Sequence, residues 1–173
     1  MARPGTVAIV AAATMLVAAG TGHGPKHHHH HHGVLSSLLS TATAVAPSGG
    51  GYTPQSWARA LLRAEGIPRT RCNVGAVISW ERAEGGHWVN DAQFNPLNTT
   101  LPEPGSSPIE GNPYGVQSYN SWAQGFAATL ATLNNGRYGG ILAALRDGGN
   151  AQAVADAEAA TPWGTGPFTA TCL

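Results

Sequence analysis

The fold expected of this chain is decided by the stretch NVGAVISWERAEGGHW at residues 73–88. Its apolar residues recur at the spacing of one helical face and predict a helix over residues 73–84. The inward stripe of that helix holds Val74, Val77, Ile78 and Glu81. Because consecutive glycines are poor helix formers, Gly85 and Gly86 end the helix and leave Glu84 at its C-terminal end.

A helix is also predicted on the N-terminal side of this stretch. Thr53 has the side chain of an N-cap, and Pro54 takes the first helical position, where a missing N–H is tolerated. Gly66 ends the run. The apolar face of this helix holds Trp57, Leu61 and Leu62.

Three further helices are predicted on the C-terminal side. The sequence Ser-Trp-Ala-Gln that begins at Ser121 has the pattern of a capping box, and the helix it opens closes at Asn135-Gly136. A fourth helix, marked by apolar residues from Ile141 to Leu145, ends at Gly148. A fifth is rich in alanine, starts after Asn150 and stops before a proline.

Residues 87–119 show no long period and contain five prolines, which predicts an irregular lobe with a short hairpin. A chain of 173 residues is long enough for one ordinary domain and short for two. We therefore expect one mainly α domain of about five helices with a loop lobe, over residues 52–173. All five tryptophans lie after residue 51, which agrees with a folded domain there.

The charge balance excludes some kinds of partner. Nine basic residues offset nine acidic ones, so no basic face predicts binding to nucleic acid or to an anionic membrane surface. We expect a monomer that needs no cofactor and no metal ion.

Residues 1–51 have the pattern of an N-terminal leader, that is, a signal peptide followed by a linker. Arg3 and the apolar run from Val7 to Ala19 predict a signal peptide over residues 1–20, because about 13 apolar residues are too few to span a bilayer. Residues 21–51, with histidines at 27–32 and a Gly/Ser stretch, are expected to be a tag and linker. The alternatives are an uncleaved signal anchor and a native metal-binding histidine tract. If the leader is cleaved, no stable membrane insertion is expected.

Two cysteines, Cys72 and Cys172, lie a hundred positions apart. In an exported chain they predict one disulfide that ties the helix containing Glu84 to the C-terminus. The alternative is two unrelated buried thiols. No CxxC pair or second histidine cluster accompanies them, so they do not predict a zinc site.

Carboxylates are scarce, which narrows the search for catalytic groups. Glu81 and Glu84 lie three residues apart and so near one helix face. A carboxyl group between an apolar stripe and a loop with aromatic residues loses water, its pKa rises, and it can act as a general acid. The loop offers three candidates for a second carboxylate: Asp91, Glu103 and Glu110. The alternative is that Glu81 pairs with an arginine and Glu84 is a solvated helix end.

Several motifs are similar to those of lysozyme-like domains from actinobacterial phage lysins and tail proteins, and more distantly to flagellar-type and autolysin glucosaminidases. The motifs cover most of residues 53–170 and are Trp80–Trp88, Asn95–Thr100, Val116–Tyr119 with Ser121-Trp122, Asn135–Tyr138 and Pro162–Thr165. The resemblance implies a lysozyme-like fold that cuts peptidoglycan glycan strands, with Glu84 as the proton donor and Glu81 in support. It also implies a protein that is secreted, or released by a phage, and that acts at the cell wall.

The resemblance further implies which residues bind the sugars. These are Asn95 and Asn98 in the loop, Gln117 as a hydrogen-bond partner of an N-acetyl group, and Tyr119, Trp88 and Trp163 as aromatic contacts. Trp163 stands where the glucosaminidases have a tyrosine, so hydrolysis and a lytic transglycosylase route that closes an anhydro ring both stay open. A rival hypothesis keeps the fold without the activity, as a wall-binding or scaffold module. A third is a cell-surface anchor.

Overall fold

The computed structural model describes residues 51–173, and it has the expected class: mainly α, with five helices in this part of the chain. The predicted signal peptide and nearly all of the predicted tag and linker lie outside the described residues. No helix among residues 51–173 is both long and apolar enough to cross a membrane.

The first two helices begin and end as local sequence signals predict. Helix α1, Pro54–Ala64, starts at Thr53, whose hydroxyl accepts a hydrogen bond from the Ser56 amide. Helix α2, Arg71–Glu84, starts two residues earlier than expected because the Thr70 hydroxyl caps it. It ends where Gly85 takes a left-handed conformation at φ 64°, which glycine adopts without strain.

The other three helices are α3, Trp122–Leu133, α4, Gly139–Asp147, and α5, Ala151–Ala159. The Ser121 hydroxyl caps α3 as expected, but the reciprocal half of the capping box is shifted. The Gln124 side chain accepts its hydrogen bond from the Asn120 amide, one residue before the cap. The Asn150 side chain caps α5 by accepting from two backbone amides.

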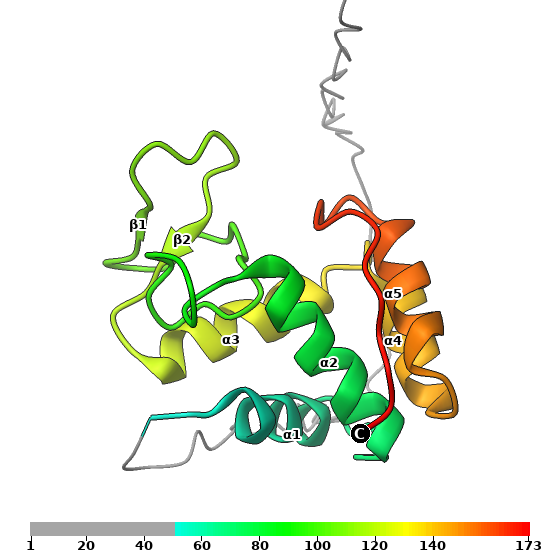
Figure 1. The fold of residues 1–173 in the computed structure, drawn as a ribbon. Coiled ribbons are helices and arrows are strands. Elements are labelled where there is room, and N and C mark those ends of the chain that lie inside the picture. The colour runs from blue at the N-terminus through cyan, green and yellow to red at the C-terminus, as the bar shows by residue number, and fades with distance from the viewer. Residues whose placement is uncertain (1–50) are drawn as a thin grey trace, which may run out of the picture. The chain divides into compact units, whose positions relative to one another are not determined.

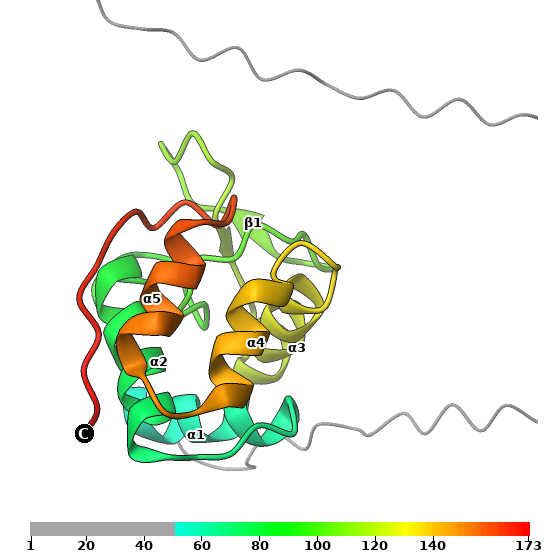
Figure 2. The ribbon, with the colours of Figure 1, turned by 90° about the vertical axis from the view of Figure 1, so that its right-hand side faces the viewer.

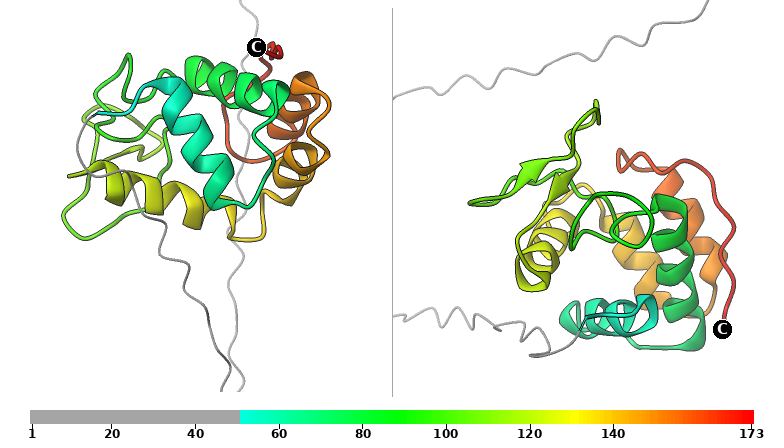
Figure 3. Two further views of the ribbon diagram at one scale, coloured as in Figure 1. Left: turned by 90° about the horizontal axis from the view of Figure 1, so that it is seen from below. Right: turned by 60° about the vertical axis from the view of Figure 1, so that its left-hand side comes forward.

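Helix α2 lies at the centre of the helical part, packed against α1 on one side and α5 on another, while α4 packs against α5 (Figure 1). Helix α3 touches α1 and supports the loop lobe, as a view from below shows (Figure 3). The core contains the expected inward residues of α1 and α2, and the largest side chains buried in it are Trp57, Trp80, Leu61 and Leu62.

The lobe between α2 and α3 holds the expected short hairpin. Strands β1, Ser107–Pro108, and β2, Gln117–Ser118, pair antiparallel, with Ser107 opposite Ser118. The rest of the lobe is turns and irregular chain fixed by side-chain hydrogen bonds.

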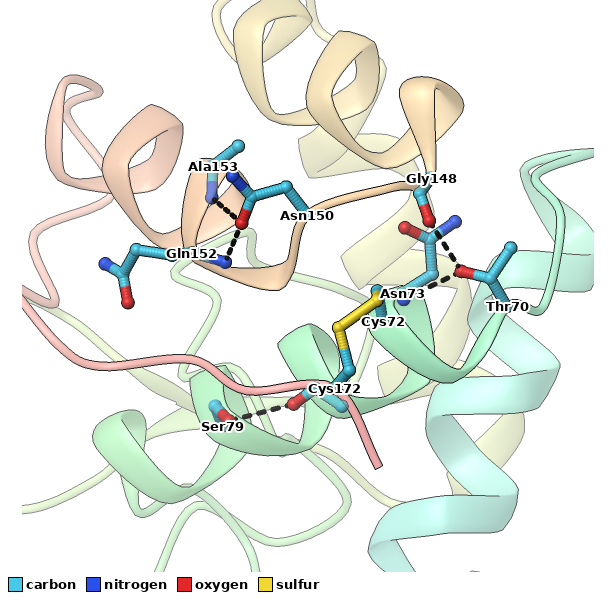
Figure 4. The surroundings of a disulfide bond; sticks show 10 residues. Thr70, Cys72, Asn73, Ser79, Gly148, Asn150, Gln152, Ala153 and Cys172 are labelled. Carbon is cyan, nitrogen blue, oxygen red and sulfur yellow. Dashed lines mark hydrogen bonds between the residues drawn. A yellow bond between two sulfur atoms is a disulfide. The ribbon is translucent and has the colours of Figure 1, made fainter.

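The C-terminal segment runs along α2 and is tied to it, as the views in Figures 2 and 4 show. Cys72 and Cys172 form the predicted disulfide, with their Cα atoms 3.8 Å apart. The Leu173 amide donates to the Arg71 carbonyl at 3.2 Å. The tail passes so close to Gly75 that a Cβ atom there would overlap the Thr171 carbonyl oxygen. A residue without a side chain is therefore required at this point of α2.

Candidate active site

Glu84 lies where the helical part meets the lobe. It is the last residue of α2 and is half-buried. A cavity of about 490 Å³ opens beside it. The cavity wall is made by α2, the lobe and the segment after α5, and its residues are Glu84, Asn98, Thr99, Thr100, Asn112, Tyr114, Val116, Thr132, Tyr138, Pro162, Trp163 and Gly164. Within the described chain, Glu84 is the only acidic residue that lines it.

Asn98 holds the end of α2 against the lobe. Its Nδ2 donates to the Glu84 carbonyl oxygen at 2.7 Å, and its Oδ1 accepts from Asn90 at 3.1 Å. Its backbone is left-handed, at φ 52°, a conformation that asparagine tolerates better than most residues. Asn98 thus lines the cavity, as expected, and also satisfies a carbonyl group that the helix leaves without a partner.

Trp163 also lines the cavity. Its Nε1 donates to the Leu97 carbonyl at 3.0 Å, so the ring is fixed in position. Its ring meets Trp80 edge-on at 4.8 Å between centroids and Tyr138 at 4.9 Å. The structure therefore brings Glu84, Asn98 and Trp163 together, three of the residues that the sequence indicated.

Thr165, just after this segment, connects Glu84 to a second carboxyl group. Its hydroxyl oxygen lies within hydrogen-bond distance of Glu84 Oε1 and is 2.6 Å from Glu158 Oε1. Trp80 Nε1 donates to the same hydroxyl oxygen at 3.1 Å. Glu158 projects from α5 and is fully buried. Helices α2 and α5, which are distant in sequence, thus converge on one hydroxyl group.

Burial is the largest influence on Glu84 and raises the pKa of its carboxyl group above the ordinary value. The charge of Glu158 raises the pKa further, whereas hydrogen bonds donated to the carboxylate, by the Thr165 hydroxyl or the Asn98 amide, act against it. No arginine of residues 51–173 contributes. This is the expected direction, and it favours the protonated form that a general acid needs.

Glu81 lies one helical turn earlier and has a different environment. It is fully buried, and burial raises its pKa to about 9, so the group is neutral at pH 7. Its Oε2 accepts from Trp88 Nε1 at 2.8 Å, and Arg82 acts on it only as a nearby charge. Glu81 does not line the cavity. The pairing of Glu81 with an arginine, left open by the sequence, is thus replaced by a hydrogen bond to an indole ring.

Trp88 is one of the expected sugar contacts that the structure does not place at the cavity. Its indole N–H is used by Glu81, and its ring packs against His87 and Trp122, at 4.8 and 5.4 Å between centroids. His87 accepts a hydrogen bond from the Phe94 amide, and burial lowers the pKa of its imidazole. These residues hold the lobe on α3 and do not face Glu84.

Three more of the expected binding residues stabilise the lobe and are absent from the cavity wall. Asn95 is fully buried, and its side chain bonds Thr99 and the Gln117 carbonyl. Gln117 uses Oε1 for Ser106 and Nε2 for a backbone carbonyl. Tyr119 is buried, with its hydroxyl on the Leu101 carbonyl and Thr99. Because a lobe without regular structure must satisfy its backbone by side chains, these polar groups serve the lobe itself in this structure.

The three candidates for a second carboxylate in the lobe, Asp91, Glu103 and Glu110, do not line the cavity. The sequence reasoning missed Glu158, although its spacing from Ala151, Val154 and Ala155 puts it on the buried face of α5. It also missed Tyr114, which lines the cavity and is 81% exposed. An acidic residue on the apolar stripe of a helix was the available signal for the first.

Residues 51–173 contain no group of three or more histidine, cysteine, aspartate or glutamate side chains arranged to hold a metal ion.

Comparison with protein families, with curated proteins and with solved structures finds no match for this chain.

Proposed function

We propose that this chain cleaves the glycan strands of bacterial peptidoglycan, with Glu84 as the general acid. The observation that carries the proposal is a half-buried carboxyl group of raised pKa on the wall of a cavity large enough for sugar rings. Its other lining groups suit a carbohydrate: hydroxyls and amides for sugar hydroxyls, and the rings of Tyr114, Tyr138 and Trp163 for their apolar faces.

The arrangement of carboxyl groups favours one route among those left open. Hydrolysis with two carboxylates needs both of them across the scissile bond, about 5–10 Å apart. Here Glu84 is alone on the cavity wall, and Glu158 is reached only through the Thr165 hydroxyl. A lytic transglycosylase needs one group that protonates the leaving oxygen and then deprotonates the sugar hydroxyl that closes the anhydro ring. A single acid/base residue suits this route better than a muramidase or glucosaminidase mechanism.

The proposal includes the site of action. A disulfide is typical of proteins in oxidising compartments, so the bond between Cys72 and Cys172 supports export and action at the cell wall, whether from a host cell or a phage.

The test is clearing of purified bacterial wall by the oxidised protein, with mass spectrometry of the released muropeptides. Glu84→Gln keeps the shape of the side chain and removes its proton, so clearing should fall about a hundredfold or more. Glu110→Gln is the matched control, because Glu110 is exposed and does not line the cavity. Anhydro-ended products support the transglycosylase route, and reducing ends support hydrolysis.

The rival hypothesis, a wall-binding module, gives a different result in the same assay. The native protein would then sediment with the wall without clearing it, and Glu84→Gln would sediment equally well. Equal clearing by the native protein and by Glu84→Gln would instead mean that another residue supplies the proton.

A further inference from the structure

The hydroxyl group of Thr165 has more neighbours than it can serve by donation. It accepts from Trp80 Nε1 at 3.1 Å and contacts one carboxylate oxygen of Glu84 and one of Glu158. A hydroxyl group has one proton to donate and two lone pairs that accept. It can therefore donate to one of the two carboxyl groups only, and the other must donate to it. A carboxyl group that donates is protonated.

The backbone of Thr165 indicates which carboxyl group accepts. The Thr165 amide donates to the same Oε1 of Glu158, at 3.4 Å. That oxygen is thus an acceptor, and the Thr165 hydroxyl group, whose oxygen is 2.6 Å from it, supplies a second donor. The two lone pairs of the hydroxyl oxygen are then left for Trp80 Nε1–H and for an O–H of Glu84. With Glu158 as the acceptor and Glu84 as the donor, each donor in this cluster has an acceptor.

We propose that Thr165 and Glu158 are positioning residues that keep the proton on Glu84, through a chain of hydrogen bonds that runs from Glu84 to Thr165 to Glu158. The inference rests on the proposed function for its catalytic meaning. The segment that follows α5 thus completes the acid at the end of α2, 81 positions away in sequence.

The chain also prepares Glu84 for the second half of the reaction. When Glu84 has given its proton to the leaving oxygen, two carboxylates face each other across one hydroxyl group. Their repulsion makes the Glu84 carboxylate a stronger base, so it takes a proton from the attacking sugar hydroxyl. The bond from the anomeric carbon to the leaving oxygen breaks, and the oxygen of the attacking hydroxyl bonds to that carbon. The O–H bond of the same hydroxyl breaks as an O–H bond on Glu84 forms, and the starting state returns.

The neighbouring titratable groups leave this pair isolated. Within the described chain, Glu158 is the ionisable group whose charge acts on Glu84. Glu81, on the preceding turn of α2, faces Trp88. Tyr114 and Tyr138 are the other titratable side chains on the cavity wall. Substitutions of Glu158 or Thr165 should therefore change the pKa of Glu84, and its titration should show the change.

The first experiment needs no substrate. The carboxyl carbons of the glutamates are labelled with ¹³C in the full-length oxidised protein and followed by NMR from pH 3 to 9, with Glu84→Gln used to assign one resonance. Glu158→Gln should lower the pKa of Glu84, because it removes a negative charge and allows an amide to donate to Thr165. Thr165→Ser should keep the native titration. In a protein that already carries Thr165→Val, adding Glu158→Gln should lower the pKa of Glu84 by less than the same change does when Thr165 is present.

The second experiment measures wall clearing against pH. Glu158→Gln should lose about tenfold or more at pH 7, where each unit of lowered pKa removes a factor of ten in the acid form, and should recover near pH 5. Thr165→Ser should follow the native profile. Thr169→Val is the control, since Thr169 is exposed and takes no part in the hydrogen bonds that link Glu84, Thr165 and Glu158. A loss that is equal at all pH values would indicate a structural role and would overturn the proposal.

Other results also decide the matter. An unmoved or raised pKa of Glu84 in Glu158→Gln overturns the chain of hydrogen bonds. If Glu158→Gln does not fold, the serine and valine substitutions at Thr165 still decide, because the chain requires Thr165→Val to change the Glu84 titration and Thr165→Ser to leave it unchanged. A native protein that gives the expected NMR titrations without clearing wall would refute the proposed function and leave the proton assignment standing.

Discussion

Replacing Glu81 with Gln should make the protein more stable at alkaline pH and less stable at acid pH. The Glu81 side chain is fully buried and its pKa is about 9, against an ordinary value of 4.5 that applies once the chain unfolds. The sign follows from proton binding. Between these two values the folded protein holds a proton on Glu81 that the unfolded chain has lost, so stability is full below pH 4.5 and falls as the pH rises towards 9.

The magnitude follows from the same pKa values. One group that titrates in this way costs about 1.4 kcal/mol of unfolding free energy for each pH unit, or at most about 4 kcal/mol from pH 5 to pH 8. Glutamine does not titrate, so the variant does not lose this part of its unfolding free energy as the pH rises. Its amide can still accept from Trp88, but it places an extra donor where Oε1 of Glu81 has no partner among the described residues. At pH 5 the variant should therefore be less stable by about 1–3 kcal/mol.

The assay is urea unfolding of both oxidised proteins at pH 5, 6, 7 and 8. The difference in unfolding free energy between the two proteins should change sign between pH 5 and 8. The variant should become more stable relative to the native protein at each higher pH. Other buried carboxyl groups affect both proteins equally and cancel in the difference. A difference that does not change with pH would mean that Glu81 titrates normally, and the argument from its burial would then be refuted.

Two further predictions concern the C-terminal tail. Cys172→Ser should lower the unfolding free energy by about 4–5 kcal/mol on the chain-entropy model for a loop of a hundred residues, measured by urea unfolding against the native protein under the same oxidising conditions. Equal stabilities would mean that the tail is held without the bond. Gly75→Ala should cost about 1–3 kcal/mol in the same measurement, because the added methyl group displaces the Thr171 carbonyl. An unchanged unfolding midpoint would contradict the close approach of the tail to α2.

The helices were predictable because their signals are local. Caps at Thr53, Ser121 and Asn150 lie within three residues of the amides they bind, so a short window of sequence contains the whole interaction. The disulfide was predictable because the chain offers only two cysteines. Glu84 was selected as the candidate proton donor because it ends a periodic helix beside a glycine pair and because these residues resemble lysozyme-like domains.

The surroundings of Glu84 were much less predictable. In a lobe without periodicity, the sequence does not indicate which polar side chains face inward, so Gln117 and Tyr119 were assigned to sugar although the lobe itself uses them. The contact between Thr165 and Glu84 spans 81 positions and depends on how α5 packs against α2. Only the position of Glu158 on the buried stripe of α5 gave a local indication of that contact.

The carboxyl groups also bear on the choice between an enzyme and a binding module. Burial raises the pKa of Glu81, Glu84 and Glu158, so each of them lowers stability at neutral pH relative to acid pH. A groove that only bound glycan would gain nothing from an acid of raised pKa on its wall, whereas a general acid requires one. Glu84→Gln should therefore gain stability relative to the native protein as the pH rises from 4 to 8, while it loses wall clearing. In the variant, the glutamine amide can donate to Thr165 as the acid does, so the fold keeps its hydrogen bond. If Glu84→Gln loses stability at every pH and binds wall as tightly as before, Glu84 serves the fold, and the binding module becomes the better explanation.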